Sequence, residues 1–281
     1  MDAHGKHFFA ERLKIKIKTN FTQKVTITRR KSKSKVSRIR KYGELLFGFQ
    51  RSKRHFFSKI KALIMDMDGT LIISQHFHAD ALIKTFKEYG ITYSREEDQK
   101  KYSGKRSKVT CEAVFKENGK NPTEEEVTAC ANQKKKYYDE IIAEAEIPQV
   151  PGIIELLKKA ETKKLPIAIA SGNKQDAAKK LLERSQIGDH WFKKIVTQEQ
   201  VKNTKPAPDL FLLAAKELSV EPQNCIVFED ALNGVKAAKA ANMFCVAVTT
   251  GESKEALQQA GADIVVQDYH ELLEKFPTLL S

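Results

Sequence analysis

Short apolar runs alternate with amphipathic stretches along the chain from residue 61 onward. The apolar runs, each followed by a polar or glycine-containing turn, are KALIMD, LPIAIAS, KKIVT, NCIVFED, FCVAVTT and ADIVVQ. The amphipathic stretches have the apolar spacing of helices with one buried face. They span residues 153–161, 174–184, 208–218 and 233–241. Because strands that alternate with helices build parallel sheets covered on both faces, this pattern predicts an α/β fold.

The stretch between the first two apolar runs departs from this alternation. Residues 76–148 contain no strand-like run, but helix-like segments occur at 79–89, 108–116 and 123–146. Prolines and a glycine mark the turn where this stretch ends. We therefore expect a smaller, all-helical domain at 76–148, inserted into an α/β core made of residues 61–75 and 149–281.

Polar side chains follow three of the predicted strands. They are, in strand order, Asp66 with Asp68, Ser171 with Gly172, and Glu229 with Asp230. The carboxyl ends of parallel strands meet at one edge of the sheet, which is where open α/β sheets bind ligands. Lys205, in the loop NTKPAPD after the third strand, can join this group.

These residue types suit phosphoryl transfer. Mg²⁺ prefers hard oxygen ligands and binds one or two carboxylates beside a substrate phosphate. Phosphate also needs donors and a cation, which Ser171, backbone amides near Gly172 and Asn173, and Lys205 can provide. As an alternative, each acid could cap a helix or bind water, and Ser171 or Asn173 could cap the helix expected from residue 174.

Four segments resemble the motifs of haloacid dehalogenase-like hydrolases, especially the phosphatase and β-phosphoglucomutase-like branch. They read DMDGTL, SGN at 171–173, KPAPDLF and VFEDALNGVKAAKAANM. The resemblance extends over residues 61–275. It implies a Rossmann-like open parallel sheet with an inserted all-helical cap.

The resemblance also implies roles for the acids. Asp66 would attack the substrate phosphorus and form an aspartyl phosphate, and Asp68 would protonate the leaving alcohol and then activate water. Mg²⁺ would be bound by the Asp66 carboxylate, the Asp68 backbone carbonyl and Asp230, with Glu229 beside it. These assignments predict covalent catalysis in two steps.

The same resemblance assigns the substrate contacts. Ser171 and Lys205 would hold the phosphoryl oxygens with help from Gly172 and Asn173, and Thr70 would orient the first loop through its hydroxyl. In the insert, the turn SGKR at 103–106 stands where relatives carry a substrate-specificity loop. Its cations Lys105 and Arg106 are therefore expected to contact substrate, or else to form a solvated basic turn.

The residues that follow the first motif differ from the pattern of relatives. Relatives carry an acid, then Ser or Thr, then Glu where this chain has Ile73, Ser74 and Gln75. His78 stands where β-phosphoglucomutase-like proteins have a histidine, although a surface or hinge histidine fits the altered neighbourhood better. In the fourth motif, Ala231 and Asn242 stand where relatives often have Ser and Gly, and neither replaces a catalytic group.

Positive charge is concentrated in residues 1–60. This segment holds 18 Lys and Arg against 3 acids, whereas the rest of the chain holds 31 against 33. A poorly ordered solvated extension, a targeting segment for an organelle or the nucleus, and an arm that binds anions or nucleic acid all fit this composition. Contact with nucleic acid is expected only through this segment.

The remaining composition favours an intracellular protein. No apolar stretch approaches the roughly 18 residues of a membrane span, so we expect a soluble chain. The four cysteines, which lack metal-ligand spacing and suit a reducing compartment, are Cys111, Cys130, Cys225 and Cys245. A cytoplasmic location is the first expectation, with an organelle or the nucleus as the alternative.

Together these observations predict a Mg²⁺-dependent phosphatase. Its substrate would be a small phosphorylated metabolite such as a sugar phosphate, glycerol phosphate or nucleoside monophosphate. A β-phosphoglucomutase-like phosphomutase is the first alternative, because both reactions share the aspartyl phosphate. A non-enzymatic protein that binds anions or nucleic acid through its basic segment is the second.

Overall fold

The computed structural model describes residues 57–102 and 105–280 of this 281-residue chain. Nearly all of the basic segment predicted for residues 1–60 therefore lies outside the described residues, as do positions 103 and 104 of the SGKR turn. Among the described residues, no helix has the length and apolar character that a membrane crossing needs.

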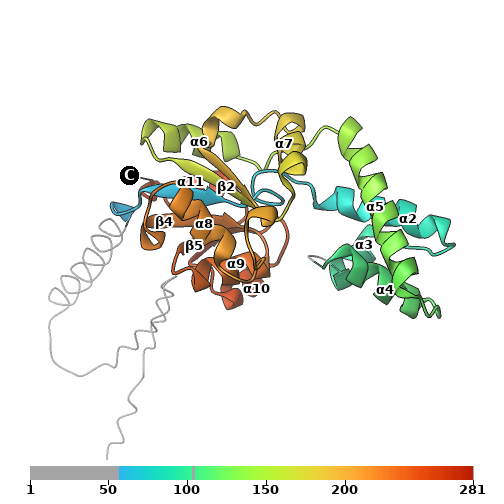
Figure 1. The fold of residues 1–281 in the computed structure, drawn as a ribbon. Coiled ribbons are helices and arrows are strands. Elements are labelled where there is room, and N and C mark those ends of the chain that lie inside the picture. The colour runs from blue at the N-terminus through green and yellow to red at the C-terminus, as the bar shows by residue number, and fades with distance from the viewer. Residues whose placement is uncertain (1–56, 103–104, 281) are drawn as a thin grey trace, which may run out of the picture. The chain divides into compact units, whose positions relative to one another are not determined.

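Six parallel strands form a single sheet in the order β3-β2-β1-β4-β5-β6 (Figure 1). Their bounds are β1 Ala62–Met65, β2 Ile167–Ser171, β3 Lys194–Thr197, β4 Cys225–Glu229, β5 Phe244–Val248 and β6 Ile264–Val266. All six predicted strands are present. Strands β1, β2, β4 and β5 are buried along their whole length, which explains their uninterrupted apolar sequences.

The strand order reverses at β1, so the chain builds the sheet outward on one side and then on the other. Strand β1 pairs with β2 and with β4, and Met65 lies opposite both Ile169 and Phe228. The residues that follow these partners therefore come together where β1 ends. Such a reversal point is where open parallel sheets bind ligands.

Helices cover the sheet in front and behind in the view of Figure 1. They are α6 Ile153–Thr162, α7 Gln175–Arg184, α8 Asp209–Glu217, α9 Leu232–Ala240, α10 Lys254–Ala260 and α11 Tyr269–Lys275, with short 3₁₀ turns η2 Asp189–Trp191, η3 Gln198–Gln200 and η4 Pro222–Asn224. Helix α8 packs on β1, β2 and β3, and α9 packs on β4 and β5. Buried side chains such as Ile64, Phe211 and Val227 form the core between these layers.

In the described part of the segment between β1 and α6, the regular elements are helices, as predicted. They form α2 Gln75–Glu88, α3 Arg95–Glu97, the π-helix η1 Asp98–Tyr102, α4 Ser107–Glu117 and α5 Glu124–Glu144. Helix α5 packs on α2 and α4, and the cap has its own apolar cluster, which includes Phe86 and Phe115. A capping box between Thr123 and Glu126 fixes the start of α5. The exact domain limits at 76 and 148 stay a prediction.

The two segments that connect the cap to the core run side by side. The amide of Ile73 donates to the Pro148 carbonyl at 2.7 Å, and the amide of Val150 donates to the Leu71 carbonyl at 3.0 Å. The chain therefore leaves and re-enters the core through one hydrogen-bonded crossing next to the end of β1. This crossing places the cap helices beside the carboxyl edge of the sheet.

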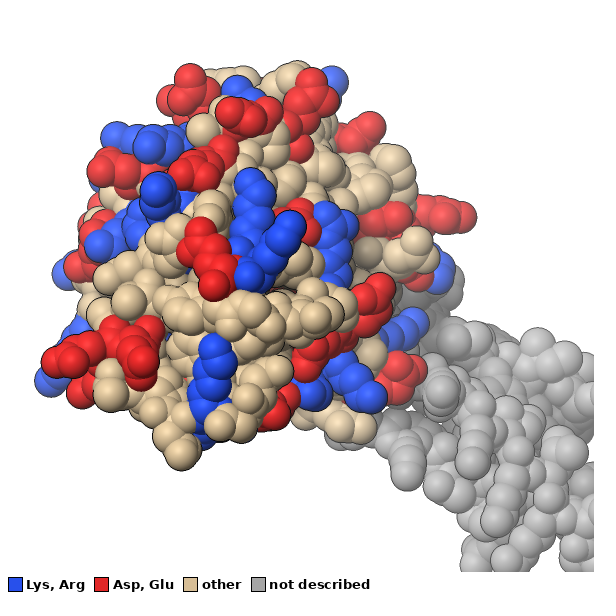
Figure 2. Space-filling model, turned by 90° about the vertical axis from the view of Figure 1, so that its right-hand side faces the viewer, with Lys and Arg blue, Asp and Glu red and all other residues tan. Residues whose placement is uncertain are grey.

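Charged side chains are mixed on the face of the molecule that Figure 2 shows. Lys and Arg lie among Asp and Glu over this face, in agreement with the nearly balanced charge of residues 61–281. The described surface in this view thus offers no broad cationic area of the kind that attracts a nucleic acid backbone.

Candidate active site

Lys205 and two carboxylates meet at the end of β1. The Nζ of Lys205 donates to Oδ1 of Asp66 and, at 2.6 Å, to Oε1 of Glu229. It also donates to the carbonyl of Ala170 at 3.3 Å. Asp66 is held in place by its own amide, which donates to the Phe228 carbonyl at 3.0 Å. Burial alone would lower the pKa of Lys205, but the two carboxylates raise it above its usual range. The lysine is therefore a fixed cation.

Asp66, Glu229 and Asp230 form a compact acidic cluster. One carboxylate oxygen from each lies within 4.8 Å of the others, and all three residues are buried. Burial raises the pKa of Asp66 to about 8, with Lys205 acting against this shift and Glu229 adding to it. Three buried carboxyl groups beside one lysine bring hard oxygen atoms together, and the raised pKa of Asp66 means that a bound cation would take the place of its proton. This donor set fits a divalent cation such as Mg²⁺.

Glu229 also fixes the turn between β4 and α9. Its Oε2 accepts the backbone amides of Asp230 at 2.9 Å and Ala231 at 3.0 Å. A Cβ at Gly234 would lie 1.8 Å from Oε1 of Glu229, so the close approach of α9 requires glycine there. Because both carboxylate oxygens of Glu229 are engaged, this residue positions Lys205 and Asp230 as well as adding charge.

Asp230 is oriented by residues from the first loop. Gln75 Nε2 donates to Oδ2 of Asp230 at 2.9 Å. Gly69 has a φ of +81°, and a Cβ there would lie 2.0 Å from the same oxygen, so the DMDGTL loop needs its glycine. Gln75, noted in the sequence only as a departure from relatives, is thus a neighbour of the acidic cluster.

Asp68 is held by different partners. Ser74 Oγ donates to Oδ1 of Asp68, and Asn173 Nδ2 donates to Oδ2. Burial raises the pKa of Asp68, and these two hydrogen bonds act against the shift. Each oxygen therefore has a fixed direction, as a group that carries a proton needs. Ser74 was not among the predicted site residues.

The turn after β2 does not cap α7. Ser171 is fully buried, and its Oγ accepts the amide of Asn173 at 3.0 Å. The residue that precedes α7 is Lys174, which makes no side-chain cap, and Glu199 accepts the amide of Gln175 at 3.0 Å. The capping alternative for Ser171 and Asn173 is therefore wrong.

Thr70 differs from expectation. It is fully buried, and its hydroxyl has no hydrogen-bond partner among the residues described. Its backbone carbonyl instead accepts the hydroxyl of Tyr269 at 3.0 Å. The loop is thus fixed through the Thr70 main chain, which corrects the predicted role of the Thr70 hydroxyl.

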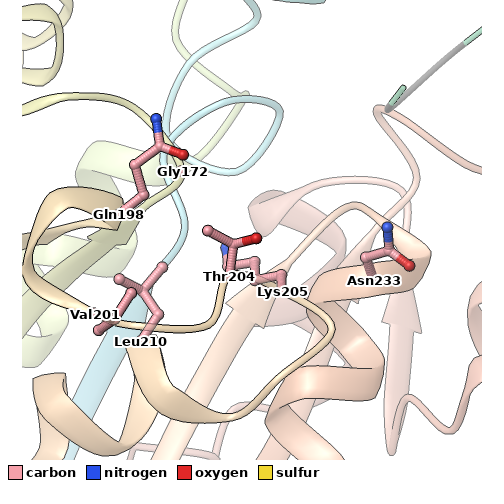
Figure 3. Close-up of a pocket in the computed structure, with 7 residues that line it drawn as sticks. All are labelled: Gly172, Gln198, Val201, Thr204, Lys205, Leu210 and Asn233. Atoms are coloured by element: carbon pink, nitrogen blue, oxygen red, sulfur yellow. The ribbon is translucent and has the colours of Figure 1, made fainter. Parts of the chain in front are cut away.

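A cavity of about 190 Å³ adjoins Lys205 (Figure 3). Val201 and Leu210 lie on one side of it and Asn233 on the other, while Gly172 and Thr204 also line it. Space beside the Lys205 side chain suits a small polar group. Gly172 and Lys205 thus line the same cavity.

The two cap cations of the SGKR turn differ in position. Arg106, directly before α4, has its Nη2 3.5 Å from Oγ1 of Thr204, the neighbour of Lys205. Lys105 instead places its Nζ 4.9 Å from the ring centre of Tyr102 within the cap. The structure therefore brings Arg106, but not Lys105, to the edge of the cavity.

Comparison with known proteins identifies the family. The family model for haloacid dehalogenase-like hydrolases matches residues 63–248. Validoxylamine A 7'-phosphate phosphatase of Streptomyces hygroscopicus subsp. limoneus is 31% identical over 220 residues, which cover 75% of this chain and 95% of that protein. The chain belongs to the haloacid dehalogenase-like hydrolase family.

Two further proteins are similar to this haloacid dehalogenase-like hydrolase. The crystal structure of β-phosphoglucomutase from Clostridium difficile has 31% sequence identity and a TM-score of 0.64, covering 79% of this chain and 97% of that one. The chloroplastic protein SUPPRESSOR OF QUENCHING 1 of Arabidopsis thaliana is 33% identical over 214 residues, but this chain spans only 20% of its length. The hydrolase thus has the Rossmann-like core with a helical cap, and it is a phosphoric monoester hydrolase.

The cap of the hydrolase contributes a buried lysine that sequence reasoning missed. Lys134 on α5 is only 7% exposed, and its Nζ lies 2.7 Å from Nδ1 of His78. The His78 ring stacks on Tyr138 at 4.2 Å, and the buried Tyr138 hydroxyl has no partner among the described residues. His78 is therefore part of a polar cluster in the cap rather than a surface histidine.

Burial controls the charges of this cluster. It lowers the pKa of Lys134 to about 8 and that of His78 to about 3, the latter with help from the Lys134 charge. Lys134 is thus cationic and His78 neutral at pH 7, so the lysine donates to the imidazole. The Lys134 charge also acts to lower the pKa of Asp68, so the cap cluster and the Asp68 carboxyl influence each other electrostatically.

The spacing of the buried residues along α5 indicates that Lys134 is buried. The buried residues of this helix are Val127, Cys130, Lys134, Tyr138 and Ile142. They recur every three or four positions, so Lys134 stands in the middle of the buried stripe. A lysine at such a position is rarely buried without a partner or a function.

Proposed function

We propose that this hydrolase is a Mg²⁺-dependent phosphatase that acts on a small phosphorylated metabolite through an aspartyl phosphate at Asp66. The observation that supports this most is the contact of Lys205 with both Asp66 and Glu229, beside Asp230. A sugar phosphate is the preferred substrate, because one relative, from Thermotoga maritima, is named a phosphorylated carbohydrates phosphatase and another is named a β-phosphoglucomutase. Glycerol phosphate and nucleoside monophosphates are the other candidates.

In the first step, an Asp66 carboxylate oxygen attacks the phosphorus of the monoester. The bond between phosphorus and the substrate oxygen breaks, and Asp68 gives its proton to the leaving alkoxide. Lys205, Ser171 and the amides of the turn at Gly172 hold the phosphoryl oxygens. The raised pKa of Asp68 supports its role as a proton carrier.

In the second step, water attacks the phosphorus of the aspartyl phosphate. Asp68 takes a proton from this water, the bond between phosphorus and the Asp66 oxygen breaks, and inorganic phosphate leaves. When bound by Asp66, the Asp68 carbonyl and Asp230, Mg²⁺ would neutralise charge so that a carboxylate can approach an anionic phosphate. Glu229 would remain beside it, holding Lys205.

The cap would select the substrate. Within the part of the chain that the structure describes, Lys134 hydrogen-bonds to His78, although an ammonium has three donors. Hydroxyl or anionic groups of the substrate would satisfy the remaining donors and the Tyr138 hydroxyl. Arg106, near Thr204, would contact the same ligand from the other side of the cap. Lys105 is a weaker candidate, since it lies over Tyr102.

A phosphomutase is the second candidate, supported by the likeness to β-phosphoglucomutase. In that reaction a sugar hydroxyl, rather than water, would attack the aspartyl phosphate. For location, we propose the cytoplasm, with an organelle as the alternative because one relative is named chloroplastic. Fluorescent fusions of the chain with and without residues 1–56 would test the location.

The function is tested by phosphate release. The full chain with Mg²⁺ is assayed against sugar phosphates, glycerol phosphate and nucleoside monophosphates, with Asp66→Asn as the blank. Asp189→Asn, at an exposed acid in η2, is the matched control and should leave turnover unchanged. Release of phosphate that disappears only in Asp66→Asn is expected, whereas isomerisation without phosphate release would favour the phosphomutase. Equal turnover by Asp66→Asn and the unmodified chain would contradict the proposal.

A further inference from the structure

Two cysteines face each other inside the cap. Cys111 on α4 and Cys130 on α5 are both fully buried, and their Sγ atoms lie 2.8 Å apart. The thiol of Cys130 donates to the sulfur of Cys111. The other two cysteines lie in the sheet, where the Cys225 thiol contacts the Glu221 carbonyl at 3.6 Å. Only the cap pair, among the described residues, brings two sulfurs together in this way.

The packing of α4 on α5 already holds the pair at nearly bonding range. A disulfide has a sulfur to sulfur distance of about 2.05 Å, so the sulfurs need to approach by less than about 1 Å. Both belong to one apolar cluster with side chains such as Val114 and Phe115, which keeps the two helices in contact. The packing of the cap therefore already brings the two sulfurs together.

The surroundings give the two sulfurs different reactivity. Lys134 follows Cys130 by one turn of α5, and its charge acts on Cys111. The hydrogen bond from Cys130 lowers the pKa of Cys111, and Lys134 adds to this, against the effect of burial. The pKa of Cys130 is raised, first by its bond to Cys111. Cys111 is thus the thiol that ionises more readily and attacks, and Cys130 is the one that resolves.

We propose that Cys111 and Cys130 form a reversible disulfide inside the cap when a peroxide oxidises Cys111. The Cys111 thiolate attacks one peroxide oxygen, the O–O bond breaks, hydroxide leaves and takes a proton as water, and Cys111 becomes a sulfenic acid. The sulfur of Cys130 then attacks the Cys111 sulfur, the S–O bond breaks, and a second water leaves with the Cys130 proton. Two thiols lose two electrons in total, and the peroxide gains them.

The bond would close the segment between residues 111 and 130 and fasten α4 to α5. Helix α5 carries Lys134, and Arg106 directly precedes α4. A link between the two helices would therefore restrict the motion of both cations relative to each other. Because both sulfurs are buried, peroxide reaches them only when α4 opens locally, and the reaction is expected to be slow. This inference is independent of the proposed phosphatase activity.

Peptide mapping tests the link directly. The reduced full chain is treated with hydrogen peroxide in its native state, unfolded, alkylated and cleaved with trypsin without reduction. Mass spectrometry should find peptides 109–116 and 121–134 joined, and dithiothreitol should separate them. Cys225 and Cys245 are internal controls and should remain alkylated. Alkylation of both cap cysteines after peroxide, a sulfinic acid at Cys111, or a link to another cysteine would overturn the proposal.

A stability measurement complements the mapping. The melting temperature of the peroxide-treated chain should rise by several degrees and return after dithiothreitol, because the link restricts the unfolded chain. Cys130→Ala and Cys130→Ser should show neither the link nor the rise. Since the main comparison uses oxidised and reduced forms of the same chain, it stands even where a variant folds poorly. Complete linkage without any rise would contradict the claim that the bond fastens α4 to α5.

Discussion

The core and the cap each bury a lysine, and the two lysines have opposite surroundings. Lys205 in the core donates to Asp66 and Glu229, which raise its pKa against the effect of burial. Lys134 in the cap contacts neutral His78, and burial lowers its pKa to about 8. The core lysine is ion-paired with carboxylates before any ligand binds, whereas the described partner of the cap lysine is a neutral imidazole. This difference separates a fixed reaction centre from a surface that needs a ligand to satisfy it.

The core carboxylates extend this contrast, whereas each region has one buried hydroxyl without a partner among the described residues. In the core, donors from the protein engage Asp66, Asp68, Glu229 and Asp230, although the Thr70 hydroxyl is unpartnered. In the cap, the Tyr138 hydroxyl is buried without a partner among the described residues. A buried polar group without a hydrogen bond is unfavourable. A polar ligand that hydrogen-bonds to the Tyr138 hydroxyl would therefore be stabilised in the cap.

Loss of the core lysine is expected to have the largest effect. Lys205→Met would leave buried carboxylates without their cation and lower the free energy of unfolding by about 3–5 kcal/mol. It would also abolish turnover. Urea denaturation measures the stability, and Lys239→Met, which removes a more exposed ion pair with Asp263, is the matched control with a smaller loss. A Lys205→Met chain as stable as Lys239→Met would remove the contrast between the regions.

Loss of the cap lysine is expected to act in the opposite direction on stability. Lys134→Met removes a buried cation and should raise the free energy of unfolding at pH 7 by about 1–3 kcal/mol, while KM rises about 10-fold or more. In the unmodified chain the folded pKa lies below the unfolded value, so stability should increase as pH rises from about 8 toward 10.5, and Lys134→Met should lack this increase. Denaturation at several pH values measures it. A destabilised Lys134→Met would show that the cap lysine is already satisfied.

Binding of Mg²⁺ should depend on pH through the core acids. The pKa of Asp66 is raised to about 8, so below that pH the cation must displace a proton. Affinity measured by calorimetry should therefore rise about tenfold per unit between pH 6 and 8. Asp66→Asn should bind weakly and with a shallower pH dependence, because burial also raises the pKa of Asp230. The same slope in Asp66→Asn would assign the proton to another group.

Gln75 should have the smallest effect, because it orients Asp230 without entering the reaction. Gln75→Ala removes the 2.9 Å hydrogen bond and should weaken Mg²⁺ binding by about tenfold, with turnover largely restored at saturating Mg²⁺. Gln133→Ala, at a half-buried glutamine of the cap whose side chain donates to Glu88, is the matched control. Turnover that stays low at saturating Mg²⁺ would give Gln75 a more direct role.

The sheet and its active edge were predictable because their signals are local. Strands buried on both faces need uninterrupted apolar runs, and polar residues after such runs must meet at one edge. The contact of Asn173 with Asp68 depends on the exact geometry of two turns, so the sequence predicts only their neighbourhood. Helix α2 begins four residues before the predicted start at residue 79, at Gln75, because Phe77 is buried with the helix although polar residues surround it.

The cap was less predictable because its features depend on packing between helices. Lys134 was missed although it stands in the buried stripe of α5, since the burial of that stripe depends on α2 and α4. The spacing of 19 positions from Cys111 to Cys130 likewise predicts no contact, because the two sulfurs meet only when α4 packs on α5. Positions of side chains across a helix interface are set by tertiary contacts that one sequence does not contain.

The central claim, that Asp66 carries the phosphoryl group while Asp68 moves the proton, is tested most directly by acid quench. The chain is mixed with Mg²⁺ and substrate, quenched, digested and examined by mass spectrometry for phosphate on the peptide that contains Asp66. Phosphate is expected in the unmodified chain and, with a reactive substrate such as p-nitrophenyl phosphate that needs no proton donor, more abundantly in Asp68→Asn. None is expected in Asp66→Asn. Phosphate on that peptide in Asp66→Asn, or its absence from the other two chains during turnover, would contradict the account.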